Sequence, residues 1–222
     1  ATASFDAGSG VIFHQDFNGV PANTVLTTNQ IRGLFSIAPM ASVKNDGTPS
    51  VMVVADPAGS GRGNVFQVSF PEGSVQARGG GAQWVTRLPG NDEYYFAYDL
   101  YVPADFNWPL SSKLPGLFGG DLSSVSGGSV SDGIQGWAVR QGMVSERRAG
   151  DTAGFRDIGF GNLGGNPHTF ENTFNIRYNY ALADARDANS VRVQPGRWMR
   201  IEQHVRMNDV GRTNGVYEAW AD

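Results

Sequence analysis

Short runs of alternating or continuous apolar residues recur along this chain, and Gly, Pro, Asn and Asp bound almost all of them. Helical periodicity is almost absent. Many short runs of this kind, separated by turn residues, are typical of β-sandwiches and jelly rolls. We therefore predict an all-β fold, a β-jelly-roll sandwich of two antiparallel sheets, with strands at 11–17, 50–55, 65–70, 82–88, 93–102, 136–144, 173–182, 197–207 and 215–221.

Length and composition predict a single folded domain over residues 1–222. The chain has 222 residues and 30 glycines, only 17% of its residues are charged, and we find neither a linker nor an internal repeat. A formal net charge of -4 gives no general attraction to nucleic acid or to anionic membranes. No apolar run approaches the ~20 residues that span a bilayer. We expect neither nucleic acid nor a membrane as a partner.

The absence of cysteine rules out disulfides and thiolate metal sites. The first ten residues, ATASFDAGSG, are small and polar, as the start of a chain is after removal of a signal peptide. No Asn-x-Ser/Thr acceptor occurs. These observations predict a secreted bacterial protein, extracellular or periplasmic.

Several side chains stand out by their position in the expected strands. Residues two apart in a strand share a face, so Arg140 lies among small residues on one face of 136–144, and the opposite face carries apolar residues and Gln141. The same parity pairs Tyr178 with Tyr180. Lys113 stands alone in SSKLPGLFGG, which we interpret as a loop. Taken alone, a lysine or arginine of this kind is more often a solvated charge, and a tyrosine pair in a strand is more often simple aromatic packing.

Their order along the chain carries more information. KLPGLFGG, an aromatic-x-x-Arg strand, a Tyr-x-Tyr strand, RWMRIEQHVRMND and GVYEAWAD follow one another. This pattern, over about two thirds of the chain, resembles the polysaccharide lyases of families fourteen and twenty, the alginate and glucuronan lyases with a concanavalin-like jelly-roll fold. The resemblance implies a catalytic set that consists of Lys113, Arg140, Tyr178 and Tyr180.

Three polar residues and one alanine depart from the family pattern. Ala138 stands where the family has a serine two residues before the arginine. Gln141, Arg177 and Asn179 stand where small or apolar residues are expected. We expect these three to face the space between the sheets and to satisfy one another, because an unpaired buried polar group costs about 1–3 kcal/mol.

The residue types suit the elimination reaction of a polyuronate lyase. Removal of the C5 proton moves negative charge onto the adjacent carboxylate, and a cation aimed at that position is worth roughly 3–4 kcal/mol in the transition state. Lys113 and Arg140 are the candidates. One of Tyr178 and Tyr180 then serves as base and acid, and the other positions the substrate. The expected partner is an anionic polysaccharide.

Two other functions remain open from the residues alone. A retaining glycoside hydrolase needs two carboxylates about 5–5.5 Å apart. No E-x-D-x-x-E strand, which would provide such a pair, occurs in the sequence. Glu146 and Glu202 nevertheless leave a catalytic carboxylate pair as an alternative. A carbohydrate-binding module or lectin of the same fold needs exposed aromatic platforms but no cation pair. The alanine at 138 is compatible with such an inactive relative.

The remaining candidates have a weaker basis. We consider His204 and Gln83 as residues that bind the sugar, although a hydrogen-bonded role suits His204 better. None of the histidines has metal-ligand spacing, so we expect no cofactor. Oxygen-rich stretches at 45–47 and 121–132 leave a structural calcium as an option. The stretch 58–64, which contains GSGRGN, resembles a phosphate loop only in its glycines.

The chain stops at GVYEAWAD, whereas the lyases that it resembles continue with further strands. Unpaired sheet edges would result. We expect that the missing C-terminal strands come from another chain or that this is a shortened form.

Overall fold

The computed structural model describes residues 10–43, 50–70, 81–106, 111–120, 136–145, 156–159, 191–192, 194–209, 212 and 214–221. They belong to two compact units, which we call the first unit (within 3–90) and the second unit (within 91–222). Each is treated by itself, and the single domain over 1–222 stays a prediction. No helix in the described part of the chain has the length and apolar character needed to cross a bilayer.

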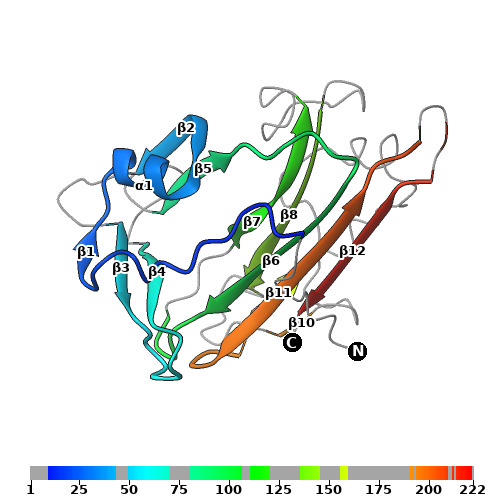
Figure 1. Cartoon of the computed structure of the whole chain (residues 1–222). Coiled ribbons are helices and arrows are strands. Elements are labelled where there is room, and N and C mark those ends of the chain that lie inside the picture. Colours follow the sequence, from blue (N-terminus) through cyan, green and yellow to red (C-terminus); the bar gives the residue numbers. More distant parts are fainter. Residues whose placement is uncertain are drawn as a thin grey trace. The chain divides into compact units, whose positions relative to one another are not determined.

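The first unit consists of two small antiparallel sheets and one short helix (Figure 1). Its sheets have the strand orders β1-β3-β4 and β2-β5. The elements are β1 (Thr24–Val25), α1 (Thr28–Phe35), β2 (Ile37–Val43), β3 (Val51–Ala55), β4 (Asn64–Val68) and β5 (Ala82–Thr86). A core of Leu26, Ile31, Phe35, Val51 and Val53 holds them together, with Phe66 and Trp84 packed against it.

Helix α1 was not predicted, yet its start has a sequence signature. Thr27 and Gln30 form a capping box in which the Thr27 hydroxyl accepts from the Gln30 backbone and the Gln30 side chain accepts from the Thr27 backbone. The helix has eight residues and ends at Ser36 in a left-handed conformation (φ 48°). Two turns bury only Ile31 and Phe35, which is too few residues for periodicity to be evident.

The strand predicted at 11–17 is wrong, because this segment is described and forms no strand. Its aromatic residues pack without a backbone ladder: the rings of Phe13 and Phe17 lie 6.1 Å and 5.9 Å from that of Phe35. The Gln15 side chain donates to the Leu34 carbonyl and accepts from the Phe17 amide. A side chain thus supplies hydrogen bonds that a neighbouring strand would otherwise make.

The second unit contains two antiparallel sheets, ordered β12-β11-β6 and β10-β9-β8-β7. Their strands are β6 (Glu93–Tyr101), β7 (Ser111–Gly120), β8 (Gly136–Ser145), β9 (Arg156–Gly159), β10 (Val191–Arg192), β11 (Trp198–Arg206) and β12 (Val216–Ala221). Figure 1 shows β6, β11 and β12 as three long neighbouring strands, with β11 in the centre. The strand predicted at 173–182 lies outside the described residues.

One buried cluster joins the two sheets of the second unit. Leu114 of β7 packs with Val102, Met199 and Ile201, and Leu100 and Tyr98 of β6 pack against them. Met199 and Ile201 are two apart on β11 and therefore share a face. This face of β11, which we call the inward face, is the one turned toward β7.

Candidate active site on β7 and β8

The register of β7 and β8 brings Lys113 and Arg140 close together in one sheet. Lys113 pairs with Gly142, and Arg140 pairs with Gly116. Position 113 is therefore opposite a residue only two positions from Arg140 on the adjacent strand. Two cations that lie 27 residues apart in sequence become near neighbours in the sheet.

Lys113 lies within a strand, which corrects the interpretation of SSKLPGLFGG as a loop. The register shifts between Lys113 and Gly116, so β7 has one extra residue opposite β8. Pro115 falls in this bulge and is exposed. Proline cannot donate to a sheet ladder and is tolerated at bulges. The Pro-Gly pair that suggested a loop instead marks an irregularity within a strand.

On both sides of the bulge, the buried residues of β7 lie on one face of the sheet. Leu114 and Leu117 are buried, and Leu117 pairs with Val139. Because neighbouring positions alternate between faces, positions 113, 116, 140 and 142 share the face opposite Leu114 and Leu117. The backbone thus assigns both predicted cations to the face of the sheet that points away from β11.

The other members of the predicted catalytic set are not described by the structure. Tyr178 and Tyr180 lie outside the described residues, as do Arg177 and Asn179. Ala138, in place of the family serine, pairs with Phe118 on β7, two positions from Arg140. Convergence of the two tyrosines with Lys113 and Arg140 stays a prediction.

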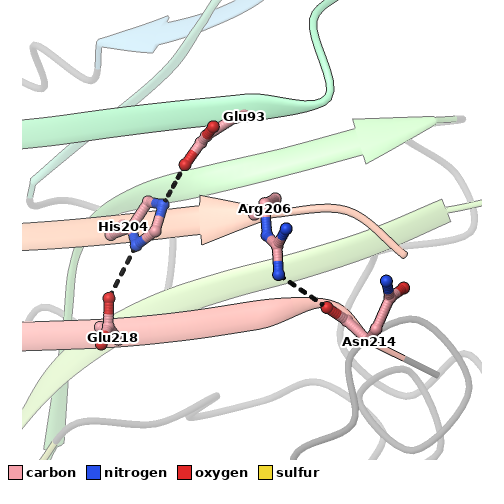
Figure 2. Close-up of polar contacts among 5 residues, drawn as sticks. All are labelled: Glu93, His204, Arg206, Asn214 and Glu218. Atoms are coloured by element: carbon pink, nitrogen blue, oxygen red, sulfur yellow. Dashed lines mark hydrogen bonds and ion pairs between the residues drawn. The ribbon is translucent and has the colours of Figure 1, made fainter. Parts of the chain in front are cut away.

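His204 lies on the other face of β11 and is held between two carboxylates (Figure 2). Its Nε2 is 2.7 Å from Glu93 Oε1 on β6, and its Nδ1 is 2.7 Å from Glu218 Oε2 on β12. The Tyr95 ring stacks on the imidazole at 4.2 Å, with the planes 3° apart. We call these three residues, Glu93, His204 and Glu218, the histidine clamp. It links all three strands of the sheet.

The position of His204 separates it from Lys113. His204 is three residues from Ile201, an odd number, so it faces away from the core cluster that contains Leu114. Both ring nitrogens already have partners, and the side chain is only 9% exposed. The geometry gives His204 a hydrogen-bonded structural role. Any sugar contact by His204, which stays a prediction, would involve the opposite side of the second unit.

Glu202 is part of an ion-pair network with Arg200 and Asp99. The Arg200 Nε donates to Glu202 Oε1 at 3.1 Å, and Arg200 Nη1 donates to Asp99 at 3.3 Å. Burial lowers the pKa of Arg200, but the hydrogen bonds to Glu202 and Asp99 more than offset this, so the pKa is raised. Glu202 is buried and ion-paired, which does not suit a general acid for hydrolysis. Glu146 lies outside the described residues.

The remaining sequence candidates are distributed over the first unit. Gln83 is exposed on β5 beside Trp84, and its sugar contact stays a prediction. GSGRGN connects β3 to β4 and not to a helix. The Asp56 carboxylate accepts from the amides of Ala58, Ser60 and Arg62. Backbone amides that a phosphate would need are thus already engaged by an acidic side chain.

No group of three or more His, Cys, Asp or Glu residues among those the structure describes is arranged to hold a metal ion. The stretches considered for calcium, 45–47 and 121–132, lie outside the described residues.

Sequence reasoning missed Glu93 and Glu218 as the partners of His204. They lie 111 and 14 residues from it, and only the strand register brings the three together. A polar residue at every second position from 200 to 206 indicated a polar face but not its partners.

Comparisons with known proteins agree with the motif pattern. The sequence model of the family described as polysaccharide lyase 14 matches residues 58–222. The search of curated proteins found no match. Among solved structures, the marine PL-14 alginate lyase from Aplysia kurodai is similar at 18% identity and a TM-score of 0.52, over 88% of this chain and 77% of that chain. This similarity confirms the predicted all-β jelly-roll fold.

Proposed function

Because the chain belongs to polysaccharide lyase family 14 and is a polysaccharide lyase, we propose that it cleaves 4-linked polyuronates, alginate or glucuronan, by β-elimination. The observation that carries this proposal is the family match over 58–222, a segment that contains Lys113, Arg140, Tyr178 and Tyr180. The register of β7 and β8 supports it, because Lys113 and Arg140 are near neighbours on paired strands.

In the proposed reaction, a tyrosine phenolate removes the proton from C5 of the uronate. The electrons of the C5–H bond form a C4–C5 double bond, and the C4–O4 bond breaks. The leaving oxygen takes that electron pair and then receives the proton from the tyrosine. One phenol serves both steps when the proton and the leaving group are on the same face of the sugar.

Lys113 and Arg140 would perform two tasks with the same charges. They neutralise the carboxylate next to C5 as negative charge develops on it. A tyrosine phenol has an ordinary pKa of about 10, so its ionisation at neutral pH costs around 4 kcal/mol. One cation about 4 Å away at an effective dielectric near 20 returns a similar amount. The pair of cations thus favours both the carbanion-like substrate and the phenolate.

Alginate is the first polymer to test, because the similar solved structure is named an alginate lyase. Glucuronan is the second polymer to test, since the motifs of this sequence also resemble those of the glucuronan lyases. Both are extracellular anionic polysaccharides, so we propose that the protein acts outside the cell.

The decisive experiment incubates the purified chain with polymannuronate, polyguluronate and polyglucuronate. The product of elimination has an unsaturated end that absorbs in the near ultraviolet, and a hydrolase forms none. We expect this absorbance to grow with at least one polymer. Binding to every polymer without any increase in absorbance would contradict the proposal and favour a carbohydrate-binding module.

Substitutions then test the residues. We expect Lys113→Ala to lower kcat by about 10²–10³-fold, as loss of one charge-stabilising donor does. Of the variants Tyr178→Phe and Tyr180→Phe, the one that removes the base should lower turnover at least 100-fold. Lys44, the only other lysine of the chain, offers a matched control: Lys44→Ala should leave kcat unchanged. Equal losses in Lys113→Ala and Lys44→Ala would refute the assignment.

A further inference from the structure

One aromatic residue of the β7–β8 sheet lies on the same face as the two predicted cations. Phe118 on β7 pairs with Ala138, and Gly116 pairs with Arg140. Positions two apart on a strand share a face, so Phe118 and Gly116 lie on the face of Arg140. Leu117, between them, is buried and belongs to the opposite face. Phe118 therefore lies on the face that the proposed function assigns to the substrate.

Phe118 is not part of the core cluster of the second unit. The partly buried residues that pack against this cluster are Tyr98, Leu100 and Phe106. Phe118 is half-buried, and the ring pairs found among the described residues of the second unit do not include it. Packing in the core between the sheets thus gives no reason for an aromatic side chain at this position.

Glycine occupies the positions next to Phe118 on this face. Along β7 these positions are Gly116 and Gly120, and across the ladder Gly136 lies two positions from Ala138. A single apolar residue on a surface is common. Glycine inside a strand weakens the strand, however, and often marks a place where a ligand approaches the backbone closely. A ring among glycines on two paired strands is therefore suited to contact with a flat ligand.

The order of the pairs along β8 gives the distance of Phe118 from the two cations. Lys113, Gly116 and Phe118 pair with positions 142, 140 and 138. Measured along the strands, the Phe118 pair is about 7 Å from the pair that contains Arg140 and about 13 Å from the pair that contains Lys113. A ring at this place can contact a sugar beside the one whose carboxylate the cations neutralise.

We propose that Phe118 is a further substrate-binding residue, an aromatic platform for the sugar next to the cleaved linkage. The C–H groups on one face of a pyranose ring are apolar, so their burial against an aromatic ring favours binding. Alanine in place of the family serine at position 138, opposite Phe118, gives this part of the face an apolar residue type. This assignment rests on the proposed function, because it takes the face with Lys113 and Arg140 as the substrate face.

Steady-state kinetics of the full chain compare Phe118→Leu, which loses the ring, with Phe118→Tyr, which keeps it. We expect Phe118→Leu to raise KM for the cleaved polymer about tenfold with kcat within twofold. A contact made equally in the bound substrate and in the transition state changes KM alone. Phe118→Tyr should keep KM within twofold of the wild type. An unchanged KM in Phe118→Leu would overturn the platform.

Phe106 provides a matched control, because it packs against the core cluster between the sheets. Phe106→Leu should lower the thermal midpoint and leave KM unchanged. Phe118→Leu should change the midpoint by no more than about 2 °C. A fall in the midpoint as large as that of Phe106→Leu, without any change in KM, would assign Phe118 to packing and refute substrate binding.

Equilibrium binding separates the platform from the proposed function. Calorimetry with polymannuronate, polyguluronate and polyglucuronate uses the inactive tyrosine variant, Tyr178→Phe or Tyr180→Phe, with and without Phe118→Leu. We expect Phe118→Leu to raise Kd about tenfold for the polymer that binds. If the wild type cleaves none of the three polymers, the proposed function fails, and calorimetry on the wild type and Phe118→Leu still decides the platform. Weaker binding by Phe118→Leu would then support it, whereas equal binding, or no binding of any polymer, would overturn it.

Discussion

Removal of the histidine clamp should destabilise the fold without affecting catalysis. His204→Ala deletes two hydrogen bonds of 2.7 Å and the parallel stack with Tyr95. The two carboxylates are about half exposed (48% and 52%), so water can hydrate them afterwards. We therefore use about 1 kcal/mol for each hydrogen bond and about 1 kcal/mol for the ring pair. The expected loss is about 3 kcal/mol in the free energy of unfolding.

Thermal and chemical unfolding measure this loss directly. For a chain of this size, 3 kcal/mol corresponds to a fall in the thermal midpoint of about 6–12 °C. Arg206 provides a control on the same strand and the same face: it is exposed and donates to the Asn214 carbonyl at 3.1 Å (Figure 2). Arg206→Gln should cost less than about 0.5 kcal/mol.

Activity measured well below the thermal midpoint decides between the two roles of His204. Because His204 faces away from β7, His204→Ala should keep kcat and KM on a polyuronate within twofold of the wild type. A several-fold rise in KM with an unchanged midpoint would refute the structural role and favour sugar binding by His204.

Three further predictions concern the core, the helix and alkaline pH. Ile201→Ala leaves a cavity in the cluster between the sheets and should cost about 2–5 kcal/mol in chemical denaturation; a loss below 1 kcal/mol would contradict the packing. Thr27→Ala removes the capping box of α1 and should cost about 1 kcal/mol, whereas Thr27→Ser should cost almost nothing. Burial raises the pKa of Tyr98 well above its ordinary value, and the nearby Tyr217 adds to the rise. The neutral phenol is thus favoured in the fold, so its contribution to stability is complete below about pH 10 and is lost as the pH rises further. Tyr98→Phe should therefore lose less stability than the wild type between pH 9 and 11, and identical pH profiles would refute this.

Several parts of the fold follow from local sequence. The runs at 93–102, 136–144, 197–207 and 215–221 became β6, β8, β11 and β12, because alternation of apolar and polar residues is a local property of a half-buried strand. The motif order also placed the chain in its family. The same local argument failed at 11–17, where the Phe13 and Phe17 rings pack against Phe35 of α1 and no strand pairs with the backbone.

The pairing register of the strands, and the choice of which strand face is buried, were decided only by the tertiary structure. Nothing in KLPGLFGG shows that Pro115 lies in a bulge or that Lys113 pairs beside Arg140, because the partner strand begins only at Gly136. Nor does RWMRIEQHVRM show that His204 joins Glu93 and Glu218 while Gln203, the adjacent residue, is buried on the other face. The sequence determines which residues alternate along a strand. Which face becomes the interior, and which distant residue lies opposite, depends on how whole sheets pair and pack.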